Sequence, residues 1–392
     1  MRVRLEALAS LEALAPLWRD LEGRAGGGFF LSWSWIGPWA ALASAPLWLL
    51  RVEHEGRVVG LSLWGACVER RRGMKVRRLA LHGSGAEEED AVGIEYNGIL
   101  AEAGLEAEVW AAGLQGLIEA RAPLWDELTA SGLAPEQAAR FGALGLPLRR
   151  LSETRAAHVD LAALRAEGVQ DLGGYLGALG KSTREQIRRS LKLYAAQGPL
   201  ALEAAREPAE LLAFWEEMRP HHQARWESRG EPGAFGRPFL VRMQERLLSA
   251  ASGEAEILRV SAGGVSFGWI YNFLEERPEG RRALFYMGGF AYAGDQRLKP
   301  GLVAHALAAE RYLRQGFAAY DFMAGDYRYK RNLGMEGPEM VALAVRRRRL
   351  LLEMEEAARK GYAAFRSARA AMASRKTASV PETVSSQEKR SA

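Results

Sequence analysis

The sequence holds a single cysteine, Cys67, among its 392 residues. One cysteine excludes an internal disulfide and a cysteine-based metal cluster, and the absence of an HExxH or Cys/His cluster predicts that no metal is bound. No apolar run reaches the roughly 20 residues that a membrane-spanning helix needs. The first residues lack the continuous apolar core of a signal peptide. These features predict a soluble protein of the reducing cytoplasm.

The signature motifs of several enzyme classes are also missing. The chain has no GxSxG nucleophile elbow, no Walker phosphate loop and no complete GxGxxG after a strand. Hydrolases, nucleoside triphosphatases and dinucleotide-binding enzymes commonly carry these motifs, because each motif presents a nucleophile or backbone N–H groups to the substrate. Their absence disfavours those three classes.

The formal net charge of +5 comes from one segment. Lys and Arg greatly outnumber acids after residue 345, so the rest of the chain has a slight excess of negative charge. A basic tail does not make the body of a protein a nucleic-acid-binding surface, and we expect no nucleic-acid partner. The run Arg346 to Arg349 is suited to contact with an anionic membrane surface.

Hydrophobic periodicity predicts an α/β protein with a mixed sheet and two similar halves. In the first half, residues 5–22 have helical spacing, and a hairpin follows with Glu55-Gly56 at its turn. In the second half, helices at about 181–197 and 208–220 precede a hairpin with Gly263-Gly264 at its turn. The stretches HEGRVVGLSLW and SAGGVSFGWIYNF share the order strand, glycine turn, strand, which suggests duplication.

We therefore predict four parts in the chain. Residues 1–150 form a first half that has lost its activity, and residues 151–349 form the acyltransferase half. Residues 350–374 form a helix, and the polar remainder, residues 375–392, is disordered.

A loop that starts a helix is the first predicted binding feature. Pro300 and Gly301 precede the helical pattern LVAHALAAERYLRQG, with Arg297 and Lys299 just before them. A helix N-terminus exposes unpaired N–H groups and the positive end of the helix dipole, so it can hold a phosphate. This arrangement suits the pyrophosphate of an acyl-coenzyme A, held by residues from Arg297 to Leu302. A simple tight turn into a helix explains the pattern too.

The segment DFMAGDYRYK follows an apolar strand, and ligand sites of α/β sheets gather at the carboxyl ends of strands. Asp321 and Asp326 could take a proton from an attacking amine or hydroxyl. Lys330 could neutralise an oxyanion, and Tyr327 or Tyr329 could protonate a leaving thiolate. An ordinary loop with a capping Asp and packed tyrosines is the alternative.

Two helical segments carry further polar residues. Arg184, Arg188 and Lys192 share one helix face at intervals of four, which suits an anionic substrate or a solvated surface equally. His222 and Trp226 also lie four apart, so they meet on a helix. His222 could act as a base, or it could be a structural histidine beside an aromatic ring.

Six pieces in a fixed order resemble the CelD-like branch of the GNAT superfamily, which is related to the FemAB-like transferases. The pieces are YLGALGKSTREQIRRSLKLYAAQG, HQARWESRG, GWIYNF, LFYMGGF, RLKPGLVAHALAAE and YDFMAGDYRYKRNLG. The resemblance covers residues 160–335 well and the first half only in outline. It implies a tandem GNAT fold and acyl transfer from coenzyme A, or aminoacyl transfer from tRNA in FemAB relatives. Family members are associated with cell-envelope and exopolysaccharide pathways.

By position, the resemblance implies a donor site and a reacting centre in the second half. The implied catalytic residues are Asp326, Asp321, Lys330, Tyr329 and His222; the donor site is Arg297, Lys299, Pro300, Gly301 and Leu302; the substrate contacts are Arg184, Arg188, Trp226 and Tyr286. The loop departs from the usual phosphate-binding pattern, since it has one glycine where two are expected.

The predicted function is acyl transfer, with N-acetyl transfer as the expected reaction, from acyl-coenzyme A to an amine or hydroxyl of a sugar or of a cell-envelope or exopolysaccharide precursor. The acceptor attacks the thioester directly, and acyl-coenzyme A is a substrate, so we expect no permanently bound cofactor. Two alternatives stay open: a tRNA-dependent aminoacyltransferase of the FemAB type, and a non-catalytic GNAT-like binding protein.

Overall fold

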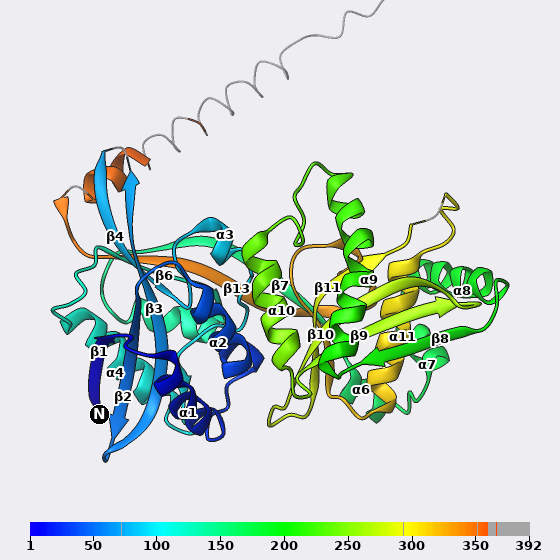
Figure 1. Ribbon diagram of the computed structural model, residues 1–392, viewed down its shortest axis with the longest axis horizontal. Helices are drawn as coiled ribbons and strands as arrows, with labels where there is room; N and C mark the ends of the chain where they lie inside the picture. The colour runs from blue at the N-terminus through cyan, green and yellow to red at the C-terminus, as the bar shows by residue number, and fades with distance from the viewer. Residues whose placement is uncertain (72, 293, 351, 360–365, 367–392) are drawn as a thin grey trace, which may run out of the picture. The chain divides into compact units, whose positions relative to one another are not determined.

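A computed structural model describes residues 1–71, 73–292, 294–350, 352–359 and 366. Its main unit, Met1–Val345, is built on one sheet with the strand order β1-β2-β3-β4-β6-β13-β7-β12-β11-β10-β9-β8 (Figure 1). The short strand β5 (Leu100–Ala101) pairs with β3 beside this path. The second unit, from Arg346, contains a helical stretch at 352–359.

The elements follow the same order in both halves. The first half contains β1 (Arg2–Ala7), α1 (Leu11–Glu22), η1 (Phe29–Leu31), α2 (Trp33–Leu42), β2 (Leu47–His54), β3 (Arg57–Arg71), β4 (Met74–Leu81), α3 (Glu87–Asp90), α4 (Glu106–Glu119), β6 (Glu127–Leu133), α5 (Pro135–Gly142) and β7 (Leu148–Asp160). Three helices follow: α6 (Leu161–Ala166), α7 (Leu172–Ala178) and α8 (Lys181–Ala195). The second half contains β8 (Leu200–Ala205), α9 (Pro208–Glu227), α10 (Pro238–Ala250), β9 (Ala255–Ala262), β10 (Val265–Glu275), β11 (Arg282–Phe290), α11 (Pro300–Arg314), β12 (Ala319–Ala324), α12 (Arg328–Leu333) and β13 (Met335–Arg346).

This order confirms a mixed α/β fold made of two similar halves. In each half, four antiparallel strands run in sequence, a helix crosses over, and the next strand pairs in parallel with the fourth. The last strands of the halves are exchanged: β7 pairs with β12 of the second half, and β13 lies between β7 and β6. The predicted boundary at residue 150 therefore falls inside β7, a strand that belongs to the sheet of both halves.

One predicted element is wrong. Residues 5–22 do not form one helix, because the chain first forms strand β1, whose residues pair with β2 at the edge of the sheet. The helix begins only at Leu11, where the Ser10 side chain accepts a hydrogen bond from the N–H of Ala13 and caps it. Both hairpins, with turns at 55–56 and 263–264, form as predicted.

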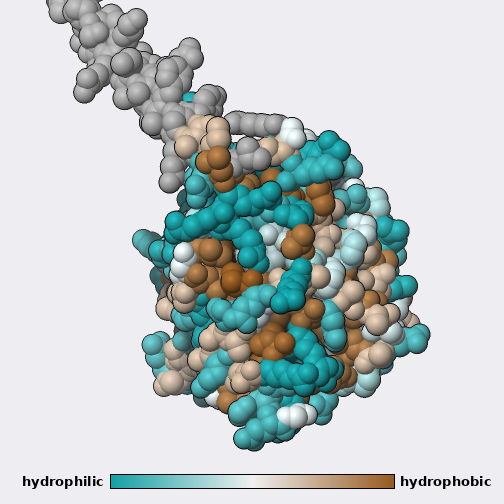
Figure 2. All heavy atoms as spheres, turned by 90° about the vertical axis from the view of Figure 1, so that its left-hand side faces the viewer, coloured by the Kyte–Doolittle hydropathy of each residue, from teal (hydrophilic) through white to brown (hydrophobic). Residues whose placement is uncertain are grey.

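Outside the main unit, residues 352–359 are helical, as predicted for part of 350–374. The remainder of that predicted helix, apart from residue 366, and the predicted disordered tail at 375–392 lie outside the described residues. No helix in the described part of the chain is long and apolar enough to cross a membrane. On the face drawn in Figure 2, hydrophilic side chains are interspersed with small hydrophobic patches.

One hydrophobic cluster joins the two halves on a single face of the sheet. Helices α1, α2, α9 and α10 all pack there, and α2 contacts α10. Phe29 of the first half stacks on Phe273 of the second, with ring centroids 3.9 Å apart, and Trp35 meets the edge of the same ring. Buried aromatic rings of this size contribute strongly to stability, so each half depends on the other for its core.

We expect Phe273→Ala to lower the free energy of unfolding by about 3–5 kcal/mol, because a buried ring that contacts both halves is lost. Most tryptophans lie in the first half, so tryptophan fluorescence reports mainly on that half. In urea, the unfolding midpoint measured by fluorescence should fall together with the midpoint measured by far-UV circular dichroism. A fluorescence transition of the variant that stays at the wild-type urea midpoint would contradict a core shared by both halves.

Candidate functional site

The site lies where two parallel strands separate. β11 and β12 pair at only three positions, 282–284 with 319–321, and then diverge. A β-bulge in the pairing of β11 with β10 falls beside Tyr286, and another in β12 surrounds Met323, which has the left-handed φ of +59°. Beyond the last paired residues, a cavity of about 500 Å³ opens between the strands, a volume typical of small-molecule sites.

The N-terminus of α11 forms one side of the cavity. Pro300 is its first residue, and the first intrahelical bond runs from the N–H of Val303 to the oxygen of Lys299. The N–H groups of Gly301 and Leu302 therefore precede the hydrogen-bonded part of the helix and are available to an anion. Lys299, Gly301 and Leu302 all line the cavity, and the Lys299 N–H donates to Ser190 Oγ at 2.9 Å.

The end of helix α9 and the turn after it form another side of the cavity. Arg225, Trp226 and Arg229 line the cavity, and the Arg225 guanidinium lies 5.0 Å from the ring centre of Tyr292. The ring of His222 lies 5.9 Å from that of Trp226, as their spacing predicts. Both nitrogens of His222 are engaged, since Nδ1 donates to Gly288 O at 2.9 Å and Nε2 accepts from Ala234 N at 3.2 Å. His222 thus fixes β11 and leaves no nitrogen free to act as a base.

A half-buried carboxylate and a buried ammonium lie at the end of β12. Glu95, from a first-half loop, accepts a hydrogen bond from Ala324 N at 2.8 Å, and burial raises its pKa to about 7. Lys330 Nζ donates to Ala324 O at 2.6 Å and to Met323 O at 3.2 Å, and burial lowers its pKa to about 8. Both groups line the cavity, where such shifts are typical of groups that exchange protons.

Asp321 has a supporting position behind this pair. It is 1% exposed, accepts from Tyr96 Oη at 2.5 Å and from Met323 N at 2.7 Å, and pairs with Arg282. Since every oxygen is engaged and Asp321 does not line the cavity, it cannot reach an acceptor. It holds the bulge that places Glu95 and Lys330, in place of the proton-transfer role predicted from the sequence.

Several other predicted site residues lie away from the cavity. The Asp326 side chain is 78% exposed and pairs with Arg331, because α12 turns the chain outward after Gly325. Arg297 is 63% exposed and pairs with Asp295. Arg184 donates to Gly177 O, and Arg188 is exposed on α8. None of these four lines the cavity. Tyr286 does, although its hydroxyl is engaged by Val92 O at 2.8 Å.

Sequence reasoning missed three kinds of lining residue. Glu95 is more than 200 residues from the motif it joins, and nothing in its loop resembles a catalytic motif. Arg225 and Arg229 were detectable, since they lie four apart inside HQARWESRG. His305 is 2% exposed and stacks on Tyr329, while Nδ1 is 2.8 Å from Tyr320 Oη; burial lowers its pKa to about 3, so the ring stays neutral.

In the described part of the chain, no group of three or more His, Cys, Asp or Glu side chains could hold a metal ion. The cavity is lined by acid–base groups and cations and by the first N–H groups of α11.

Part of the chain is similar to a known protein family. Residues 181–331 match the model of the acetyltransferase (GNAT) domain, so this segment is similar to that family. The match spans α8 to α12 and so includes the cavity except for its first-half loop. No curated protein matches the chain.

Solved structures extend the likeness to both halves. FemX shares 13% identity over 87% of this chain and 97% of its own, with a TM-score of 0.54. The L-PGS of Bacillus licheniformis shares 13% over 90% and 97%, with a TM-score of 0.53. At this identity the likeness concerns the fold alone, so the chain has a FemX-like fold whose two halves share one order of elements.

We expect Asp321→Asn to destabilise the protein by about 3–5 kcal/mol, because it removes the buried negative charge that pairs with Arg282. Asp326→Asn is the matched control, since its exposed carboxylate should change stability by less than about 0.5 kcal/mol. Urea denaturation measures both values. Equal effects would show that Asp321 has no special supporting role.

Proposed function

We propose that this protein is an acyltransferase that moves an acyl group from acyl-coenzyme A to an amine or hydroxyl of a small anionic acceptor. The observation that carries the proposal is the cavity between β11 and β12, which is lined both by the first residues of α11 and by the acid–base pair Glu95 and Lys330. The donor's pyrophosphate lies at Gly301 and Leu302 beside Lys299, and its thioester extends between the strands toward Glu95.

The reaction balances with groups of this chain. Glu95 takes the proton of the acceptor as its nitrogen or oxygen forms a bond to the thioester carbon. Two of the three ammonium protons of Lys330 bond to backbone carbonyls, which leaves one for the developing oxyanion. The carbon–sulfur bond then breaks. Tyr329, which keeps its proton because burial raises its pKa, donates a hydrogen bond to the departing thiolate, and the proton that Glu95 took from the acceptor passes to that thiolate and restores the carboxylate.

The acceptor enters along α9. Arg225 and Arg229 contribute positive charge there, and Trp226 and Tyr292 contribute flat apolar surfaces. Guanidinium groups bind phosphate or carboxylate, and aromatic faces stack on sugar or other rings. An amino sugar that bears a phosphate or carboxylate has this chemistry, which agrees with a precursor of a cell-envelope or extracellular polysaccharide.

An aminoacyl-tRNA is the competing donor. The FemX-like fold favours it to the extent that fold alone can, and the cations at the cavity would also accept the phosphates of a nucleic acid. Acyl-coenzyme A is preferred because the cavity has the volume of a small-molecule site and lies between the two diverging strands.

Gly301→Trp should abolish acetyl-coenzyme A binding in calorimetry, because the indole would occupy the space beside the first N–H groups of α11. Gly177→Trp on α7 is the matched control: that position faces open space away from the cavity, and binding should persist. Wild-type protein that fails to bind any short acyl-coenzyme A, but transfers from aminoacyl-tRNA, would replace the donor proposed above.

Glu95→Gln should lower kcat by about 100-fold or more, the usual contribution of a general base. In the wild type, kcat/KM should rise with pH through about 7, because only the carboxylate accepts a proton and burial raises the pKa of Glu95. It should fall again above about 8 as Lys330 loses its charge. The release of thiol from acetyl-coenzyme A, with a panel of amino-sugar phosphates as acceptors, measures this pH profile. If kcat/KM of Glu95→Gln still rises with pH through about 7, the base is another residue.

A further inference from the structure

Glu95 lies in an irregular segment, residues 92–98, between α3 and β5. Asn97 fixes the end of this segment in the first half: its Nδ2 donates to Leu81 O at 3.2 Å and to Ser131 O at 3.0 Å. The backbone N–H of Asn97 also donates to Gly132 O at 2.8 Å. Glu95 is two residues earlier, so a second tie, at the start of the segment, decides how freely its carboxylate moves.

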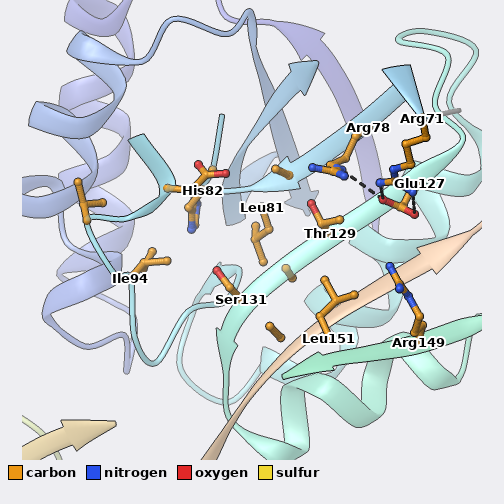
Figure 3. Close-up of a pocket in the computed structure, with 16 residues that line it drawn as sticks. Arg71, Arg78, Leu81, His82, Ile94, Glu127, Thr129, Ser131, Arg149 and Leu151 are labelled. Carbon is orange, nitrogen blue, oxygen red and sulfur yellow. Dashed lines mark hydrogen bonds and ion pairs between the residues drawn. The ribbon is translucent and has the colours of Figure 1, made fainter. Parts of the chain in front are cut away.

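The side chains of the segment point in turn to two different cavities. Ile94 lines a first-half cavity of about 320 Å³ together with Leu81 and Ser131 (Figure 3). Gly93 and Glu95, its two neighbours, line the cavity between β11 and β12. This alternation is that of an extended segment, whose successive side chains point to opposite sides. The direction of the Glu95 carboxylate therefore depends on the path of the backbone between residues 92 and 95.

Tyr286 of β11 provides the tie at the start of the segment. Its Oη donates to Val92 O at 2.8 Å, three residues before Glu95. Burial raises the pKa of Tyr286, so the hydroxyl keeps the proton that it donates. On the other side of Glu95, Tyr96 Oη donates to Asp321 at 2.5 Å. Two tyrosine hydroxyls thus hold the chain before and after the carboxylate.

A buried amide of α10 orients the Tyr286 hydroxyl. Gln244 is 0% exposed; its Nε2 donates to Tyr286 Oη at 3.4 Å, and its Oε1 accepts from Tyr271 Oη at 2.9 Å. Gln244 does not line the cavity between β11 and β12, so it has no contact with a molecule bound there. A buried amide is costly unless it is hydrogen-bonded, and these two tyrosines are the partners that allow it in the core.

We propose that Tyr286 is a positioning residue for the transfer reaction: its hydroxyl, bonded to Val92 O, fixes the backbone that aims the Glu95 carboxylate into the cavity. Gln244 supports the hydroxyl from behind. This role differs from the substrate contact that the family resemblance implied for Tyr286, because its hydroxyl proton is given to Val92 O. The effect on transfer rests on the proposed function of Glu95, whereas the effect on the place of the carboxylate does not.

The environment of Glu95 gives the direction of the expected change. Burial is the main cause that raises its pKa to about 7; the Ala324 hydrogen bond and Lys330 lower the pKa, and Asp321 raises it. The charged or titratable groups around it are Lys330 of α12, Asp321 of β12, Arg225 of α9, His305 of α11 and the neighbouring Tyr96. Tyr286→Phe leaves all of these in place and frees the segment. Water then reaches the carboxylate, and the pKa of Glu95 should fall toward the ordinary value of a glutamate.

Carbon-13 NMR of protein with carboxyl-labelled glutamate measures this fall without any assumption about the reaction. The signal that is absent from Glu95→Gln belongs to Glu95, and in the wild type it should titrate at about 7. In Tyr286→Phe it should titrate lower by about one pH unit or more. Gln244→Leu should shift the signal in the same direction, and it serves alone if Tyr286→Phe does not fold. A Glu95 signal that titrates at the wild-type pH in these variants would overturn the proposal.

The kinetic consequence has a matched control. Tyr286→Phe should lower kcat by about tenfold or more and move the rise of kcat/KM to lower pH, while the Kd of acetyl-coenzyme A stays unchanged. Tyr175→Phe removes a buried hydroxyl that also donates to a backbone carbonyl at 2.8 Å, that of Leu333, and should leave the rise of kcat/KM in place. The same shift in both variants would indicate a general loss of stability and contradict the proposal. Protein that transfers nothing from acetyl-coenzyme A would count against the proposed donor and leave the NMR result valid.

Discussion

Two parallel strands that stay bonded for only three residues impose the main constraint on this structure. Where β11 and β12 diverge, their backbone groups face a cavity, and a buried N–H or C=O without a partner is costly. Charged side chains provide the partners: Glu95 accepts from Ala324 N, Lys330 donates to Met323 O and Ala324 O, and Asp321 accepts from Met323 N. The residues suited to catalysis are thus also those that stabilise the opening.

This double use explains why the second half cannot complete its site alone. Lys330 buried without a nearby carboxylate would lose its charge, because desolvation disfavours the ammonium form. Glu95 offsets that cost and comes from the first half, where Tyr96 also extends across to Asp321. The exchange of β7 and β13 and the shared aromatic cluster around Phe273 keep the two halves in register, so the loop that carries Glu95 is held at the β12 end.

Much of the fold could be predicted from the sequence, because hairpin turns such as Glu55-Gly56 and helix starts such as Pro300 are local signals. The site was less predictable. Lys330 and Gly301 lie in compact motifs and do line the cavity, but Asp326, only four residues from Lys330, is exposed, because it precedes the short helix α12 while Lys330 lies within it. Glu95 was beyond reach, since its role depends on a contact between distant segments and on burial, neither of which has a pattern along the chain.

The comparison of the halves suggests how one copy of a duplicated fold keeps its activity while the other supports it. Both halves open a gap after three paired positions, so both face the same unsatisfied backbone groups. The second half satisfies them with charged side chains and leaves a cavity. The first half satisfies them with the amide of Asn97, a neutral group that fills the gap and needs no partner charge. Once Asn97 closes the first gap, the residues just before it are held rigidly, and Glu95 can be presented to the second half at little additional entropic cost.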